Sequence, residues 1–167
     1  MRHSSAASDD VLLSLARKLG RLLVTHKLIL STAESCTGGL IAKCITDVPG
    51  SSRYFSGGVV SYSNDIKEKV LHVDRRLIAA HGAVSEEVAR AMARGVQKVM
   101  GTDCSVAVTG IAGPDGGSAE KPVGLVYAAV AKGGTVEVKR FVFPGDRDGI
   151  RRQTARAAMD MLIRFLR

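Results

Sequence analysis

Tryptophan is absent from this sequence, and aromatic residues together make up only 4% of it. Proteins that hold single-stranded nucleic acid usually stack its bases on aromatic side chains, so this scarcity argues against such a partner. The net charge is +8, from 24 Lys and Arg against 16 Asp and Glu, and it is dispersed along the chain. A dispersed excess of positive charge suits phosphate-bearing small molecules, and we expect no nucleic-acid partner.

Histidine and cysteine are also few, which bears on metal binding and on redox setting. The four histidines are scattered and lack the spacing of zinc ligands, so we expect neither a metal nor another cofactor. The three cysteines, Cys36, Cys44 and Cys104, are odd in number and form no C-x-x-C pair. Free thiols in a reducing, cytoplasmic setting are the simplest account of them.

Long apolar runs are missing as well. No run approaches the ~20 residues that a membrane-spanning helix needs. The first nine residues lack the apolar centre of a signal peptide. We therefore expect a cytoplasmic protein without a membrane partner.

Apolar residues make up 46% of the 167 positions, which is enough for one domain with a sizeable core. We predict a disordered tail over residues 1–8 and a single domain over residues 9–167. Stretches with helical periodicity alternate with short β-branched runs, and a Gly133-Gly134 hairpin signal comes late in the chain. This order predicts an α/β fold with three layers (α/β/α) and a mixed sheet of about five strands.

The expected boundaries follow from caps, glycines and periodicity. Ser63 and Ser85 are predicted helix caps, and Gly101 is a predicted helix end. The predicted helices cover about 9–25, 40–45, 63–71, 75–80, 86–100 and 148–166. The predicted strands cover about 27–33, 55–62, 104–109, 123–131 and 135–143.

The stretch Ala33-Glu34-Ser35-Cys36-Thr37-Gly38-Gly39 separates a predicted strand from a predicted helix. A nucleophile in such a turn would lie beside the free N–H groups of a helix N-terminus, which can stabilise an oxyanion. Equally, Ser35 or Thr37 could be a simple helix cap. Cys36 is a rival nucleophile, since a thiol at a helix N-terminus can have a lowered pKa, but it lacks a histidine partner.

Without a usable histidine, a serine nucleophile needs another base, and lysine is the known alternative. Lys67 is predicted to lie in the first turn of a helix, where the dipole disfavours an ammonium. The alternative is that Lys67 is a solvated surface residue, as we expect for Lys69.

A long polar loop over residues 110–122 follows a predicted strand and is rich in glycine. Such a loop lets backbone N–H groups approach an anion, although its spacing matches neither a P-loop nor a dinucleotide fingerprint. Arg147 follows in a Pro-Gly-Asp-Arg turn and suits bidentate phosphate binding. A surface arginine at a helix start is the alternative.

Taken together, these motifs resemble the C-terminal domain of the CinA (competence/damage-inducible protein) family, the nicotinamide-nucleotide amidases. The matching stretches are Ala33–Gly39, Gly50–Ser52, Tyr62–Lys67, His81–Ser85, Thr109–Gly117 and Phe143–Arg147. The resemblance covers the chain from about residue 8 to its end.

The resemblance implies deamidation of nicotinamide mononucleotide to nicotinate mononucleotide and ammonia, within pyridine-nucleotide recycling. It implies Ser35 as nucleophile, Lys67 as base and Tyr62 as an aid to proton transfer. The substrate would be bound by Ser52, Thr109, Arg147, Thr37, Gly38, Gly39 and Gly113. The partner would be a small phosphorylated nucleotide, and the apolar helices suggest a homo-oligomer. The alternative is a non-catalytic nucleotide-binding or competence-related regulatory module.

Overall fold

The computed structural model describes the backbone of residues 3–167 and the side chains from Asp9 onward. Helix α1 spans His3–His26 and so begins well before the predicted start near Asp9. The sequence explains the difference, because Ala6 and Ala7 favour helix and no glycine or proline interrupts this stretch. Residues 3–8 of the predicted disordered tail are therefore helical, while Met1 and Arg2 lie outside the described residues.

The α-helices and strands after α1 match the predicted ones in type and order, with ends that differ by a few residues, whereas the short 3-10 helix η1 was not predicted. Within the described chain they are β1 (Leu30–Glu34), α2 (Leu40–Thr46), the 3-10 helix η1 (Ser51–Arg53), β2 (Phe55–Val60), α3 (Asn64–Lys69), α4 (Arg75–His81), α5 (Glu86–Met100), β3 (Cys104–Gly110), β4 (Leu125–Lys132), β5 (Thr135–Val142) and α6 (Arg147–Phe165).

The five strands form one mixed sheet in the order β2-β1-β3-β4-β5. Strand β1 is parallel to both of its neighbours, and β3, β4 and β5 are antiparallel in turn. Every residue of β1 is buried, as expected for a parallel strand covered on both faces. The predicted mixed sheet is confirmed.

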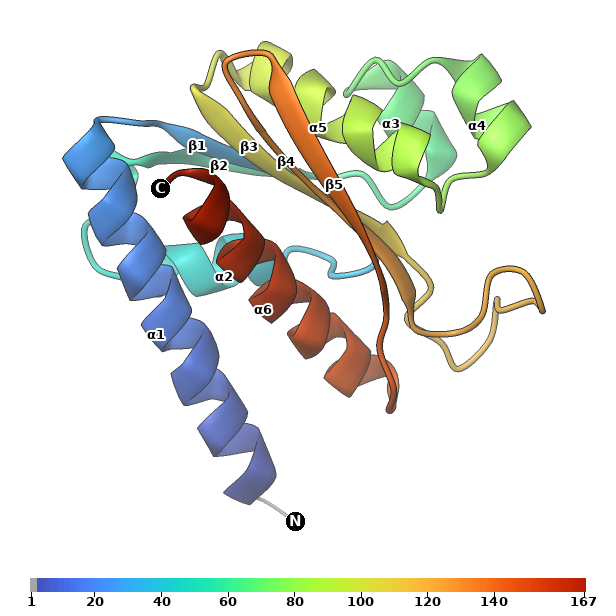
Figure 1. The fold of residues 1–167 in the computed structure, drawn as a ribbon, viewed down its shortest axis with the longest axis horizontal. Coiled ribbons are helices and arrows are strands. Elements are labelled where there is room, and N and C mark those ends of the chain that lie inside the picture. The colour runs from blue at the N-terminus through green and yellow to red at the C-terminus, as the bar shows by residue number, and fades with distance from the viewer. Residues whose placement is uncertain (1–2) are drawn as a thin grey trace.

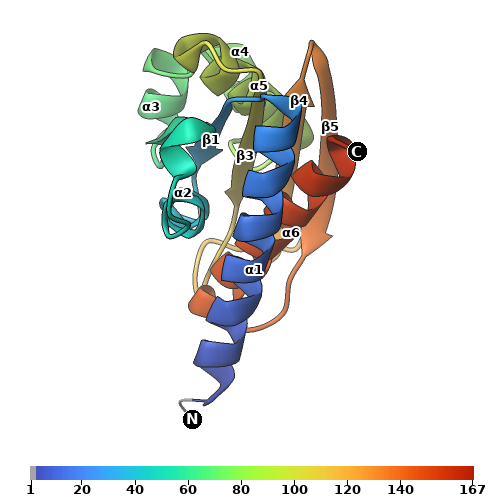
Figure 2. The same ribbon diagram turned by 90° about the vertical axis from the view of Figure 1, so that its left-hand side faces the viewer.

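Helices cover both faces of this sheet, which confirms the three-layer prediction (Figures 1 and 2). Helices α1, α2 and α6 lie on one face, where Leu23, Leu30 and Leu162 belong to one buried cluster. Helices α3, α4 and α5 lie on the other face, where Met92 and Ala107 belong to a second cluster. None of the described helices is long and apolar enough to cross a membrane.

The predicted serine caps fix where two helices begin. The Ser63 hydroxyl accepts a hydrogen bond from the Ile66 N–H at 3.2 Å, and the Ser85 hydroxyl accepts one from the Val88 N–H at 3.4 Å. The cap at Ser63 matters most for function, because it sets the rotation of α3 and hence the direction of the side chains that follow.

Candidate active site

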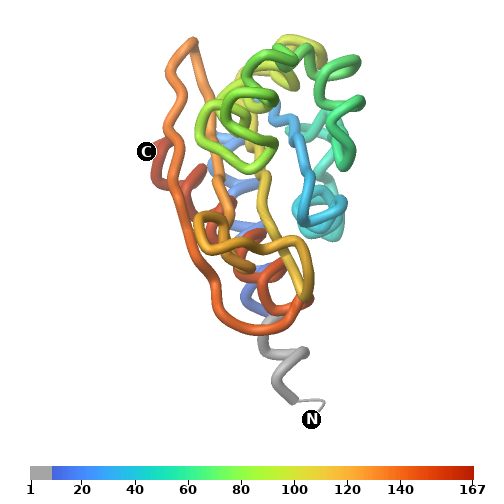
Figure 3. The backbone as a smooth tube through the Cα atoms, turned by 90° about the vertical axis from the view of Figure 1, so that its right-hand side faces the viewer, coloured from blue at the N-terminus to red at the C-terminus, as the bar shows by residue number. Residues whose placement is uncertain are grey.

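The carboxyl ends of the parallel strands β1, β2 and β3 meet at one edge of the sheet, and a cavity of about 230 Å³ lies there. Open α/β sheets bind ligands outside such strand ends. Figure 3 looks toward this edge, where the gold loop after β3 lies beside the orange-red segment that enters α6. Five separate segments line the cavity: Ser35 and Cys36, then Tyr62, Asn64 and Lys67, then Ala83 and Val84, then Thr109, Gly110 and Ala112, and finally Arg147.

Ser35 is the first residue after β1, and the centre of the sheet fixes its position. Its backbone N–H donates to the carbonyl oxygen of Val108 in β3 at 3.1 Å. The residue is 8% exposed and its side chain lines the cavity. A hydroxyl anchored in this way is held in a narrow range of positions, which suits a nucleophile.

Glu34 organises the turn after β1, a role that the sequence alone did not indicate. Its side chain is 1% exposed, and its carboxylate accepts hydrogen bonds from the backbone N–H groups of Gly39, Ile41 and Ala42 at 3.0, 3.0 and 2.8 Å. These donors belong to the first turn of α2, whose N-cap Gly39 has no side chain to satisfy them. The carboxylate therefore caps α2 from the end of the preceding strand and complements the helix dipole.

Thr37, Gly38 and Gly39, which were predicted to bind the substrate, belong to this same turn. The buried Thr37 hydroxyl donates to Glu34 at 2.6 Å. Gly38 and Gly39 have φ angles of 59° and 95°, a left-handed backbone that favours glycine. None of the three belongs to the cavity lining. The Thr37 hydroxyl and the two glycines therefore shape the loop that presents Ser35.

Two N–H groups of this turn remain available beside Ser35. Among the backbone hydrogen bonds of residues 3–167, none to another residue uses the N–H of Cys36 or of Thr37. The neighbouring N–H groups of Ser35 and Gly38 are already paired with carbonyl oxygens. The N–H groups of Cys36 and Thr37 thus have no carbonyl partner in the turn that carries Ser35.

Lys67 reaches the same cavity from α3, the helix that follows β2. The side chain is 1% exposed, and its Nζ lies 3.2 Å from Ser35 Oγ. Nζ also donates to the carbonyl oxygens of Ser61 at 2.6 Å and of Tyr62 at 3.4 Å. The structure therefore brings together the two residues that were predicted as nucleophile and base.

The surroundings of Lys67 make its ammonium easier to deprotonate. Burial lowers the pKa of Lys67 to about 8, and no carboxylate of the described side chains forms an ion pair with it. A neutral amine has two hydrogens, which match the carbonyl oxygens of Ser61 and Tyr62, and one lone pair. That lone pair is left for the hydroxyl of Ser35, as a general base needs.

Cys36 is the weaker candidate nucleophile, although it lines the cavity beside Ser35. Its side chain is 5% exposed, and burial raises the pKa of the thiol to about 12. The nearby cations Lys67 and Arg151 lower that pKa by less than burial raises it. The thiol is therefore protonated at neutral pH and lacks the thiolate that attack requires.

Arg147 stands at the rim of the cavity at the start of α6. Its Nη1 donates to the Gly113 carbonyl oxygen at 2.7 Å, and its Nη2 donates to the Tyr62 hydroxyl at 3.0 Å. No carboxylate pairs with this guanidinium among the described side chains. Gly113 thus contributes a carbonyl that orients Arg147, and Tyr62, which is 59% exposed, forms the other side of the rim.

Thr109 and Lys121 hold the opposite wall of the cavity in place. The buried Thr109 hydroxyl donates to the Ala83 carbonyl oxygen at 2.8 Å. Lys121 in the glycine-rich loop donates to the carbonyl oxygens of His81 at 2.6 Å and Val84 at 2.9 Å. The loop after β3 is thereby tied to the connection between α4 and α5, which supplies that wall.

Ser52 does not line this cavity, and Asn64 does so without having been predicted. Ser52 is exposed in η1, ahead of the amino end of β2, so the parallel strands place it at the opposite end from Ser35. Asn64 follows the Ser63 cap and turns toward the cavity. Its place in the Tyr62–Lys67 stretch was the one signal that could have suggested it.

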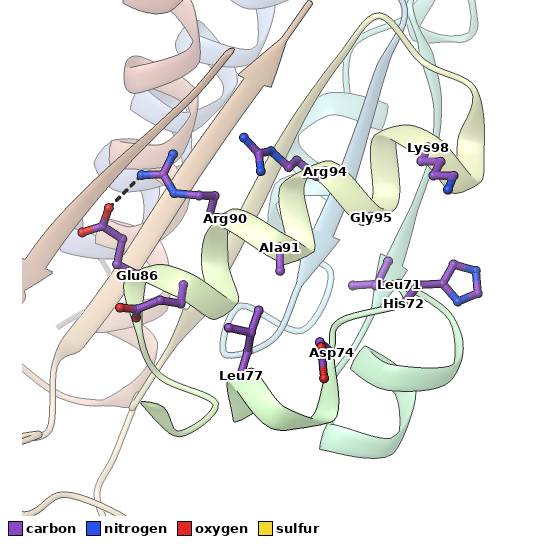
Figure 4. A pocket seen from close by; sticks show the side chains of 11 residues that line it. Leu71, His72, Asp74, Leu77, Glu86, Arg90, Ala91, Arg94, Gly95 and Lys98 are labelled. Atoms are coloured by element: carbon purple, nitrogen blue, oxygen red, sulfur yellow. Dashed lines mark hydrogen bonds and ion pairs between the residues drawn. The ribbon is translucent and has the colours of Figure 1, made fainter. Parts of the chain in front are cut away.

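A larger hollow, of about 500 Å³, lies between α5 and the segment that leads into α4 (Figure 4). Its lining mixes apolar side chains such as Leu77 and Ala91 with charged ones, and Glu86 pairs with Arg90 at 2.7 Å. The lining contains no serine, threonine or cysteine. Without a nucleophile it is a weaker candidate for a catalytic site than the cavity at Ser35.

No group of three or more His, Cys, Asp and Glu side chains that could hold a metal occurs in the part of the chain that the structure describes.

Fold and site together define an α/β protein with a buried Ser-Lys pair at the carboxyl edge of a mixed sheet. The family model of the CinA C-terminal domain matches residues 12–166, so the chain belongs to that family.

Relatives and solved structures agree with this membership. The chain is 53% identical over 159 residues to the "Putative competence-damage inducible protein" of Moorella thermoacetica, which covers 95% of this chain and 38% of that protein. It is 55% identical over 154 residues to the "CinA-like protein" of Geotalea uraniireducens, covering 92% of this chain and 35% of the relative. The chain thus spans little more than a third of these relatives' length.

The crystal structure of the competence/damage inducible protein CihA from Agrobacterium tumefaciens has the same fold. It superposes with a TM-score of 0.92 at 43% sequence identity, covering 94% of this chain and 96% of that one. The CinA superfamily protein KP700603 from Klebsiella pneumoniae superposes with a TM-score of 0.90 at 35% identity.

Proposed function

We propose that this protein is an amidohydrolase that converts nicotinamide mononucleotide to nicotinate mononucleotide and ammonia. The observation that carries the proposal is the buried Lys67 Nζ at 3.2 Å from Ser35 Oγ, in an ion pair with no carboxylate of the described side chains. A buried serine next to a lysine of lowered pKa is the arrangement of a nucleophile and its base. Family membership supports the substrate class.

In the proposed first step, the lone pair of Lys67 takes the proton of Ser35 as Oγ attacks the carboxamide carbon. The carbonyl π bond becomes a lone pair on oxygen, and the N–H groups of Cys36 and Thr37 are suited to stabilise this oxyanion. Because Glu34 holds the turn that contains both donors, they are fixed before substrate arrives.

In the second step, the tetrahedral intermediate collapses and its C–N bond breaks. The ammonium of Lys67 returns its proton to the departing nitrogen, so that ammonia leaves and Lys67 is neutral again. Water then attacks the acyl-enzyme with Lys67 as base, and the nicotinate carboxylate and the Ser35 hydroxyl are released. Tyr62 is assigned an assisting part in proton transfer, and its hydroxyl is kept at the rim by Arg147 at 3.0 Å.

The cavity has room for the amide-bearing ring more readily than for a whole nucleotide. Its volume of about 230 Å³ is smaller than the ~300–1,000 Å³ of typical ligand pockets, so the ribose phosphate would lie over the rim. Arg147 stands there with a guanidinium that no carboxylate neutralises among the described side chains, and such a group suits a phosphate. Thr109 and Asn64 line the same cavity and can contact the ring or ribose.

The test is ammonia release from nicotinamide mononucleotide by the wild type, Ser35→Ala and Lys67→Ala, with Lys69→Ala as the matched control. Lys69 is exposed and pairs with Asp65 at 2.7 Å, so its loss should leave activity unchanged. Full activity in Ser35→Ala would rule out Ser35 as the nucleophile. Loss of activity in Cys36→Ala alone would assign the role of nucleophile to the Cys36 thiol. Saturable binding without any product in the wild type would identify a nucleotide-binding module instead of an enzyme.

A further inference from the structure

A separate cavity, of about 390 Å³, lies between α1 and the segment that joins α2 to β2. Three arginines stand around it: Arg17 and Arg21, one turn apart on α1, and Arg53 in η1. It adjoins the amino end of β2, whereas Ser35 follows the carboxyl end of β1, so the two cavities are at opposite ends of the parallel strands.

The charged side chains that line this cavity are all positive. No Asp or Glu is among its lining residues, and none of the three arginines is in an ion pair within the described side chains. Within the described residues, the one hydrogen bond of their guanidinium groups runs from Arg53 Nε to the Gly50 carbonyl oxygen at 3.4 Å. A bound anion would reduce the repulsion between these three neighbouring cations. Because the forked guanidinium group matches the geometry of phosphate oxygens, a phosphate is the anion that suits them best.

The rest of the wall is mostly apolar, and its polar side chains are those of Thr25 and Tyr54. Val24, Val48 and Pro49 form an apolar side, and Val24 is 40% exposed. The Tyr54 hydroxyl is buried without a hydrogen-bond partner. It lies against Gly20, where an added Cβ would come within 2.5 Å of it. A buried hydroxyl without a partner is uncommon. Its oxygen is not exposed to the cavity, so the charged contacts for a ligand come from the three arginines.

We propose that this cavity binds a phosphorylated small molecule with a flat apolar portion, such as a nucleotide. The phosphate lies on Arg17, Arg21 and Arg53, and the ring packs against Val24 and Pro49. The site is independent of the amidase proposal, since it shares no lining residue with the cavity at Ser35.

The experiment uses AMP as the probe and follows the ¹⁵N–¹H spectrum and the heat of binding of the whole chain. AMP is expected to shift the amide signals of Gly20 and Arg53, to bind more weakly at high salt, and to bind more tightly than adenosine or inorganic phosphate alone. The Arg17→Gln/Arg21→Gln/Arg53→Gln variant is expected to bind AMP at least about tenfold more weakly. Arg147→Ala, which alters the other cavity, is expected to retain these shifts.

The matched control is Arg75→Gln/Arg140→Gln/Arg156→Gln, which removes the same charge from exposed arginines that form no ion pair among the described side chains. It should bind AMP as the wild type does. If both triple variants bound AMP equally weakly, the loss of affinity would be explained by net charge alone and the proposed site would be overturned. Wild-type affinity in the first triple variant, or AMP shifts abolished by Arg147→Ala, would overturn it as well. Tight binding of a DNA oligonucleotide to the same arginines without AMP binding would overturn the small-molecule assignment.

Discussion

The carbonyl oxygen of Ser61 accepts a hydrogen bond from Lys67 Nζ at 2.6 Å, the shortest contact that this nitrogen makes. A carbonyl can accept from an ammonium or from an amine, so it holds Lys67 in place in either protonation state. The Ser35 hydroxyl, in contrast, can donate to Lys67 only when the amine is neutral. Lys67 is thus fixed in position while its protonation decides whether it can act as a base.

The pH dependence of the proposed reaction follows from this. The pKa of Lys67 is lowered by burial to about 8, so roughly a tenth of the molecules carry the neutral base at pH 7. We expect kcat/KM for nicotinamide mononucleotide to rise with pH and level off above about pH 8, as measured by ammonia release across pH 6–9.5. Lys67→Arg, whose side chain cannot deprotonate, should be inactive throughout. A flat profile in the wild type would contradict the role of Lys67.

The same lowered pKa makes stability depend on pH with a defined sign. Between the folded pKa of about 8 and the unfolded value of about 10.5, the unfolded chain binds the lysine proton and the folded one does not. Stability should therefore rise with pH across that window, by on the order of 2–3 kcal/mol relative to Lys67→Met, in which this titration is absent. Urea unfolding of both proteins at pH 7.5, 9 and 10.5 measures this difference in unfolding free energy. If the unfolding free energies of the two proteins changed in parallel with pH, burial would not shift the pKa of Lys67.

Glu34 should be needed both for stability and for the turn that presents Ser35. The two carboxylate oxygens of Glu34 together accept four hydrogen bonds. Glu34→Gln keeps the size of the side chain but replaces one of these oxygens with an NH₂ group, which donates. We expect a loss of about 2–4 kcal/mol of unfolding free energy, because buried donors of α2 lose their acceptor. Activity should fall by about 100-fold through misplacement of the nucleophile.

Glu120→Gln is the matched control for Glu34→Gln, since Glu120 is exposed and forms no ion pair among the described side chains. It should change neither urea unfolding nor ammonia release. If Glu34→Gln were as stable and active as this control, the carboxylate would not be what shapes the turn.

Arg147 should distinguish phosphorylated from unphosphorylated substrates. Arg147→Ala is expected to raise KM for nicotinamide mononucleotide by at least about tenfold, the loss of one charged hydrogen bond. Turnover of nicotinamide riboside, which lacks the phosphate, should change little. Arg156→Ala, an exposed arginine on the same helix, should affect neither substrate. Equal losses on both substrates would assign Arg147 to holding Gly113 and Tyr62.

How much the sequence predicted depends on how local each interaction is. The Ser63 cap followed from the local sequence. The lack of a usable histidine suggested a lysine base, and the family resemblance implied the Ser35–Lys67 pair. The role of Glu34 was missed because its hydrogen-bond partners come five to eight residues later, after a turn. An acidic residue at the end of a strand does not by itself indicate that its carboxylate will cap the next helix. Ser52 was grouped with Ser35 because motif order does not say which end of a strand a residue adjoins.

The order of the strands links this chemistry to folding. Strand β2 is at the edge of the sheet and is bonded only to β1, and the carbonyl groups that hold Lys67 follow directly from it. Edge elements open locally at a smaller free energy than the whole domain. The base would then leave its place while the central strands stay paired. Activity should therefore report on local fraying of β2, disappearing at urea concentrations where circular dichroism still shows a folded chain.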